Sequence, residues 1–199
     1  MMTYLWSDLS PELQEQAEPA RVAAQQGKSV LLVGPAGSGK TMIARRLRRA
    51  VATDRELAEA RAISRLAGLK RSELEPPFRA PHHTVSVAGM RGDGKKMLPG
   101  ELSLAHSGVL FLDEVPEFST AVLHLVAETQ ANKAVYLPAR PQTFALCTMP
   151  ASFVLVGAAN TCPCGQRGGS RECSCSPREV EQYQRRTHCI YWDAMVSIT

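Results

Sequence analysis

Aromatic residues and long apolar runs are both scarce in this chain. Phe, Trp and Tyr make up 6% of its 199 residues. The longest apolar stretches, such as VLLVG at 30–34 and GVLFL at 108–112, are far shorter than the roughly 20 residues that cross a bilayer. The N-terminus also lacks the basic-then-apolar pattern of an export signal. We therefore expect a cytoplasmic protein with no membrane partner.

The chain also has little excess charge of either sign. Twenty-three Lys and Arg against 19 Asp and Glu leave a formal charge of +4, which suits a protein that meets a polyanion but is common on proteins that meet none. The hydrophobic content of 44% and the charged content of 21% are typical of soluble globular proteins. Length and composition together predict one folded unit.

Short apolar segments alternate with helix-like segments along the chain. The apolar segments at 29–34, 108–112 and 152–160 have the length of buried strands. Helical composition precedes the first of them, where Ser10 is a candidate cap and Pro19 is expected to interrupt the helix. Helix-like segments also follow, at 41–68 and 118–132. This alternation predicts an α/β fold with a mainly parallel sheet.

Two further segments have the composition of loops or hairpins. Residues 71–100 contain several prolines and the glycine-rich stretch AGMRGDGKK, which a regular helix does not tolerate. We expect a long loop or an inserted hairpin there, with a strand at TVSVA, residues 84–88. A proline-marked hairpin is expected at 133–146.

The stretch GPAGSGKT at 34–41 matches the pattern G-x-x-x-x-G-K-[ST], and it lies between a strand-like and a helix-like segment, as a phosphate-binding loop requires. Glycines let the backbone turn its amides toward phosphate oxygens. Lysine reaches the β and γ phosphates, and threonine ligates Mg²⁺. If the loop were only a glycine turn between strand and helix, neither the lysine nor the threonine side chain would have a role. The candidate nucleotide-binding residues are Gly34, Pro35, Ala36, Gly37, Ser38, Gly39, Lys40 and Thr41.

Hydrolysis also needs an acidic pair, and the stretch VLFLDE supplies one. Asp113 follows an apolar strand, where it can bind Mg²⁺ together with Thr41, and Glu114 can act as a general base on water. Asn160 ends a third apolar strand and could orient the attacking water or touch the γ phosphate. The alternative for Asn160 is an ordinary turn residue.

Taken in this order, these strand ends resemble the core of an AAA+ ATPase, a three-layer P-loop NTPase domain. Three stretches resemble the magnesium chelatase-like ATPases in particular: FRAPHHT at 78–84, LPGELSLAHSGVLFLDEVPEF at 98–118 and ANTCPCGQRGGSRECSCSP at 159–177. The last is similar to a competence-related group of branch-migration helicases within that family. The resemblance implies that Asn160 is the polar sensor and that the hairpin at 133–146 faces the pore of a ring.

The chain departs from this family at both ends. The competence-related group carries a protease-like domain before the core, whereas here about thirty residues precede the phosphate loop. A helical lid is expected to be absent, and Ala194 stands where the family has an arginine that reaches the neighbouring subunit's nucleotide. We expect a truncated protein with an N-terminal helical segment (1–26) and an ATPase core (27–199). Arg185 and Arg186 are candidate substitutes for the arginine.

Three functions remain open at this point. The first is a subunit that binds MgATP and hydrolyses it weakly when alone, in a ring of identical or related AAA+ subunits. The second is a nucleotide-binding adaptor or a degenerate paralogue without turnover. The third is a fragment of a DNA branch-migration motor, for which DNA is a partner.

Four cysteines form a separate cluster in the sequence. Cys162-x-Cys164 and Cys173-x-Cys175 could surround Zn²⁺ as a closed tetrahedral site. The spacing C-x-C is less usual for zinc than C-x₂-C. The alternative is a set of four reduced thiols without a ligand, so the candidate cofactors are ATP, Mg²⁺ and, at this cluster, Zn²⁺.

Overall fold

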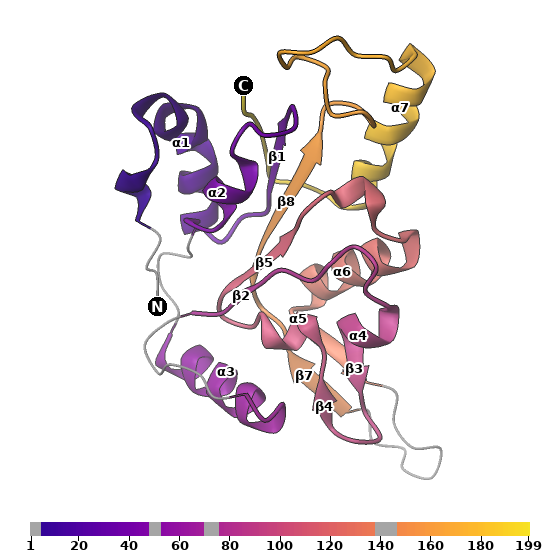
Figure 1. The fold of residues 1–199 in the computed structure, drawn as a ribbon. Coiled ribbons are helices and arrows are strands. Elements are labelled where there is room, and N and C mark those ends of the chain that lie inside the picture. Colours follow the sequence, from indigo (N-terminus) through magenta and orange to yellow (C-terminus); the bar gives the residue numbers. More distant parts are fainter. Residues whose placement is uncertain (1–4, 48–52, 70–75, 138–146) are drawn as a thin grey trace.

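The centre of the fold is a five-stranded parallel sheet (Figure 1). The computed structural model describes residues 5–47, 53–69, 76–137 and 147–199. From one edge to the other the strands are β2 (Phe78–Arg79), β5 (Val109–Leu112), β8 (Val154–Asn160), β1 (Val30–Gly34) and β9 (Ala194–Ser197). All four pairings are parallel. The prediction of an α/β fold with a mainly parallel sheet is therefore confirmed.

Buried side chains cover both faces of this sheet. In β1, Val30 and Leu32 belong to one buried cluster and Leu31 to the other, because successive side chains of a strand point to opposite faces. Helices of the first layer are α1 (Pro11–Gln25) and α2 (Lys40–Ala44); those of the second are α4 (Val87–Arg91), α5 (Glu101–Leu104) and α6 (Thr120–Asn132). A sheet between two helical layers explains why its strands are continuous apolar runs.

Helix α1 runs through Pro19 without a break, so the predicted interruption is wrong. Ser10 caps the helix by accepting a hydrogen bond from the Leu13 amide at 3.4 Å. A proline inside a helix costs about 3 kcal/mol. Pro19 is exposed, whereas the helix buries small residues on both sides of it, and this packing against the sheet keeps the helix continuous. The buried residues are Ala17, Ala20, Ala23 and Ala24.

The helix-like segment after the phosphate loop consists of two helices. Helix α2 ends at Ala44, and α3 (Asp54–Leu66) begins after Thr53. The Thr53 hydroxyl accepts from the Glu56 amide at 3.2 Å, and the Glu56 carboxylate accepts from the Thr53 amide at 2.8 Å. This reciprocal cap marks a new helix start. The sequence pattern T-x-x-E at 53–56 already contains the signal.

Residues 76–100 are more regular than predicted. Arg79 of β2 donates to both carboxylate oxygens of Glu101, at 2.7 and 2.6 Å, and this fixes the edge strand. The inserted hairpin is present as β3 (Gly92–Asp93) and β4 (Leu98–Pro99). The strand predicted at 84–88 is wrong, because the Ser86 hydroxyl accepts from the Gly89 amide at 3.0 Å and starts helix α4.

A hairpin is present after α6, but its second strand lies beyond the predicted range 133–146. Strands β6 (Ala134–Leu137) and β7 (Cys147–Pro150) pair antiparallel, while residues 138–146 lie outside the described residues. The remaining elements are helix α7 (Pro177–Arg185) and the 3₁₀ helices η1 (Trp6–Asp8), η2 (Val115–Glu117) and η3 (Arg186–Cys189). Among the described residues, the helices are too short or too polar to span a membrane.

Candidate functional site

The carboxyl ends of the central strands carry the residues that the sequence singles out. Strand β1 ends at Gly34, and the glycine-rich loop leads from it into α2 at Lys40. Gly37 and Gly39 have φ angles of 83° and 87°, a left-handed conformation that glycine adopts without steric cost. The loop thus turns sharply between strand and helix, as a phosphate-binding loop does.

Lys40 is buried, with 8% of its surface exposed. Its ammonium donates to the carbonyls of Gly34 and Pro35, at 3.0 and 2.7 Å. Burial lowers the pKa of Lys40, while the carboxylates of Asp113 and Glu114 partly offset this effect. The amine therefore lies inside the loop, close to both acidic residues of the candidate site.

The acidic pair comes from β5, which is separated from β1 by β8. The Thr41 hydroxyl donates to Asp113 Oδ2 at 3.0 Å, so the two candidate Mg²⁺ ligands lie in direct contact. Glu114 is exposed and has a φ of 55°, a value uncommon for residues other than glycine. Its amide donates to Asp113 Oδ1 at 3.1 Å. This bend places two consecutive carboxylates at the same edge of the sheet.

Asn160 ends β8 in register with Gly34 of β1. Beside it lies Tyr183 of α7, which the sequence analysis did not consider. Burial raises the pKa of Tyr183 to about 12. A hydrogen bond with the Asn160 backbone lowers this pKa, whereas the Glu117 and Glu114 carboxylates raise it further. The phenol is therefore neutral near neutral pH. The capping pattern S-x-x-E at 176–179, which forms in the structure, could have revealed the helix that carries it.

The four cysteines after Asn160 come together as one cluster. Their sulfur atoms all lie within 4.8 Å of one another, and Cys162 is buried. The backbone of Gln166 and the Cys162 and Cys175 thiols lower the pKa of Cys164 to about 6. The backbone of Cys164 favours ionisation of Cys175, but burial and the neighbouring thiols outweigh it and raise the pKa of Cys175 to about 12. Close contact among the four thiols thus favours ionisation of Cys164 and opposes ionisation of Cys175.

The resemblance implies that an arginine is missing at residue 194. This residue lies at the end of the sheet opposite the candidate phosphate site. Ala194 begins β9 and pairs with Val30, the first residue of β1. Of the two candidate substitutes, Arg185 forms an ion pair with Glu181 at 2.6 Å. Arg186 donates to the Phe118 carbonyl at 3.0 Å. Neither of these partners belongs to the phosphate loop.

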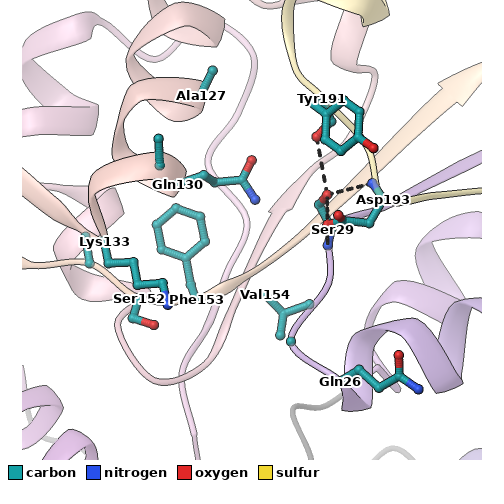
Figure 2. A pocket seen from close by; sticks show the side chains of 13 residues that line it. Gln26, Ser29, Ala127, Gln130, Lys133, Ser152, Phe153, Val154, Tyr191 and Asp193 are labelled. Atoms are coloured by element: carbon teal, nitrogen blue, oxygen red, sulfur yellow. Dashed lines mark hydrogen bonds between the residues drawn. The ribbon is translucent and has the colours of Figure 1, made fainter.

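A cavity of about 440 Å³ lies at that same opposite end (Figure 2). Its walls include residues that precede or begin strands β1, β8 and β9, among them Ser29, Val154 and Asp193. In Figure 2 the Ser29 hydroxyl lies between Tyr191 and Asp193, and it donates to Asp193 Oδ2 at 2.7 Å. The cavity is therefore separate from the candidate phosphate site.

Comparison with known families and sequences gives consistent matches. The sequence model described as magnesium chelatase, subunit ChlI, matches residues 10–195. The chain is 38% identical over 189 residues to the uncharacterized protein YifB of Escherichia coli, covering 92% of this chain and 37% of that protein. It is 36% identical over 182 residues to the competence protein ComM of Haemophilus influenzae, covering 87% and 34% respectively. The chain thus spans little more than a third of these relatives.

Solved structures share the fold at low sequence identity. NtrX from Brucella abortus matches with a TM-score of 0.55 at 13% identity, covering 96% of this chain and 36% of that one. The same protein in complex with ADP matches with a TM-score of 0.51 at 16% identity, covering 95% and 36%. These matches, together with the strand order, identify the fold as that of an AAA+ P-loop NTPase domain.

Proposed function

Because the chain belongs to the magnesium chelatase ChlI family, we propose that it binds ATP as the Mg²⁺ complex at the loop 34–41. The observation that carries the proposal is the contact between Thr41 and Asp113 beside the buried Lys40. Hydroxyl and carboxylate oxygens are the ligands that Mg²⁺ prefers, and a lysine in a glycine-rich loop binds phosphate. The ADP complex of the structural neighbour NtrX supports a nucleotide as the ligand.

In this proposal each side chain has a separate role. Lys40, which donates to two carbonyls of its own loop, binds the β and γ phosphates instead when nucleotide is present. Thr41 and Asp113 hold Mg²⁺, which offsets the negative charge of the phosphates. The backbone amides of residues 34–41 complete the phosphate contacts.

We further propose that Glu114 and Asn160 support hydrolysis. Glu114 is exposed at the strand end next to Asp113, where its carboxylate can accept a proton from an attacking water. Asn160, in register with Gly34, can orient that water. These roles make the protein an ATPase, with Glu114 as the general base and Asn160 as the polar sensor.

Turnover by the isolated chain is proposed to be slow. The family resemblance implies that Ala194 takes the place of the arginine, and Arg185 and Arg186 have other partners. An arginine supplied to the transition state is worth about 10³- to 10⁵-fold in rate. Assembly into a ring with related subunits that keep the arginine would supply the missing group, and hairpin β6–β7 would face the pore of that ring. In a ring of identical subunits another residue would have to replace the arginine. The alternative is a nucleotide-binding adaptor, which joins a ring of complete ATPases and has no turnover of its own.

The deciding experiment measures binding and turnover together. Purified protein is titrated with a fluorescent ATP analogue in Mg²⁺, and ATP turnover is followed over a range of protein concentrations. Lys40→Ala should abolish both signals, whereas Lys95→Ala, an exposed lysine in the β3–β4 hairpin, should leave both unchanged. Wild-type protein that does not bind the analogue contradicts the proposal.

The same preparation tests the role of a partner. Turnover that rises with protein concentration indicates self-assembly, whereas binding without turnover at every concentration favours the adaptor. A motor on DNA is the remaining candidate, supported by the similarity to a protein named for competence. It predicts binding to branched DNA that weakens steeply with salt, because phosphate contacts release counterions.

A further inference from the structure

We propose that Cys162, Cys164, Cys173 and Cys175 bind one Zn²⁺ ion, and that this ion holds the loop after β8 against the phosphate loop. The metal part of the proposal is independent of nucleotide. The coupling to the phosphate loop rests on the proposed function. Four thiolates from one short loop are a closed ligand set, which is typical of a structural zinc site.

The distances between the sulfur atoms fit a single tetrahedral ion. Zn–S bonds of about 2.3 Å at tetrahedral angles place the sulfur atoms about 3.8 Å apart. The Sγ atoms of Cys162 and Cys164 are 3.4 Å apart, and Cys173 Sγ lies 3.7 Å from each of them. The whole set lies within 4.8 Å. Disulfides require about 2.05 Å, so these are four separate thiols gathered around one point.

A backbone amide beside the cluster can stabilise a negatively charged sulfur atom. The Arg167 amide donates to Cys162 Sγ at 3.4 Å. Such outer contacts orient the ligands of a metal and stabilise their charge. A divalent cation at the centre of the cluster would offset the negative charge that four thiolates bring together.

The loop that carries the cysteines has little else to order it. Residues 161–176 contain no helix or strand, and only Cys162 and Gly165 among them are buried. A segment of this length without secondary structure is uncommon unless it has a function or is held by a cross-link. With no apolar core of its own, the loop must offset its conformational entropy by other bonds. Metal coordination supplies that free energy directly.

A backbone hydrogen bond joins the cysteine loop to the phosphate loop. The Ala36 amide donates to the Gly165 carbonyl at 2.8 Å. Gly165 follows Cys164 and has a φ of 72°, and a Cβ at this position would lie 3.1 Å from the Cβ of Ala36. The same Cβ would lie 3.6 Å from Asn160 Nδ2. A metal bound at Cys164 therefore fixes the backbone that supports Ala36 and borders Asn160.

The metal itself is tested first. Wild-type chain is expressed with added zinc, purified without chelators and analysed for all transition metals by mass spectrometry. One zinc per chain is expected. The double variant Cys173→Ser/Cys175→Ser should lose it, while Cys189→Ser, a thiol outside the cluster, should retain it. Absence of metal from folded wild-type protein, or iron in place of zinc, overturns the proposal. Circular dichroism shows whether each variant is folded.

The coupling is tested on the same samples. Removing zinc from wild-type protein should weaken binding of the fluorescent ATP analogue about three- to tenfold, the effect of losing roughly one hydrogen-bonded support. Gly165→Val should retain zinc and show a similar loss of affinity. Equal affinity with and without zinc overturns the coupling alone. Zinc-bound protein that never binds the analogue contradicts the proposed nucleotide site and leaves the metal site standing.

Discussion

The Thr41 hydroxyl and the Asp113 carboxylate lie 3.0 Å apart, although 72 residues separate them in the chain. If both hold Mg²⁺, Thr41→Val should weaken Mg²⁺-dependent ATP binding about 10- to 100-fold, the effect expected for losing a polar contact to a charged group. Thr41→Ser keeps the hydroxyl and should bind almost normally. Titrations with and without Mg²⁺ measure the difference, and equal affinities for the two variants contradict the assignment.

Glu114 should matter for turnover and not for binding. Replacing it with Gln removes the proposed base and should reduce the ATPase rate about 10²- to 10⁴-fold. Affinity for MgATP should change little. The matched control is Glu117→Gln, an exposed carboxylate in η2. A Glu114→Gln variant that retains its rate would show that another group activates water.

Nucleotide binding should take up protons at alkaline pH. Burial lowers the pKa of Lys40 in the free protein, whereas bound phosphates favour its charged form and raise that pKa again. Affinity should therefore fall as the pH rises through the lowered pKa. Calorimetry in two buffers of different ionisation enthalpy measures the proton uptake. The uptake should disappear at pH values well below the lowered pKa, where the amine is already charged in the free protein, and its persistence there would assign it to another group.

The link between the starts of β1 and β9 should contribute to stability. The Asp193 carboxylate accepts from the Ser29 amide and from its hydroxyl, each at 2.7 Å, and the hydroxyl accepts from the Asp193 amide at 3.0 Å. Ser29→Ala should lower the free energy of unfolding by about 1–2 kcal/mol and the melting temperature by about 2–8 °C. Ser197→Ala, an exposed serine of β9, is the control, and equal effects of the two variants would contradict this role.

Much of the fold could be predicted because parallel strands buried on both faces are continuous apolar runs. Strands β1, β5 and β8 all follow this rule. Strand β2 could not be recognised in this way, because its two residues are half-buried and are fixed by the Arg79–Glu101 pair. The break expected at Pro19 was wrong for a related reason: packing of neighbouring alanines outweighs a local preference. The domain boundary at residues 26 and 27 stays a prediction.

For the candidate site, too, one part could be predicted from the sequence and another part could not. Residue types and their spacing predict Lys40, Thr41, Asp113, Glu114 and Asn160 as candidates, because phosphate and metal chemistry demands those groups after strands. Tyr183 was missed because a buried phenol has no sequence signature of its own. The C-x-C spacing left the cysteine cluster undecided between metal and free thiols.

The sequence by itself determined which chemical groups this protein has and the order in which strands, loop and helices follow one another, since these depend on local periodicity and on short motifs. Only the tertiary structure decided which groups meet. The strand order brings Thr41 beside Asp113, and the loop after β8 brings four thiols within 4.8 Å and Gly165 against Ala36. Such contacts depend on long-range packing, which has no counterpart in local sequence.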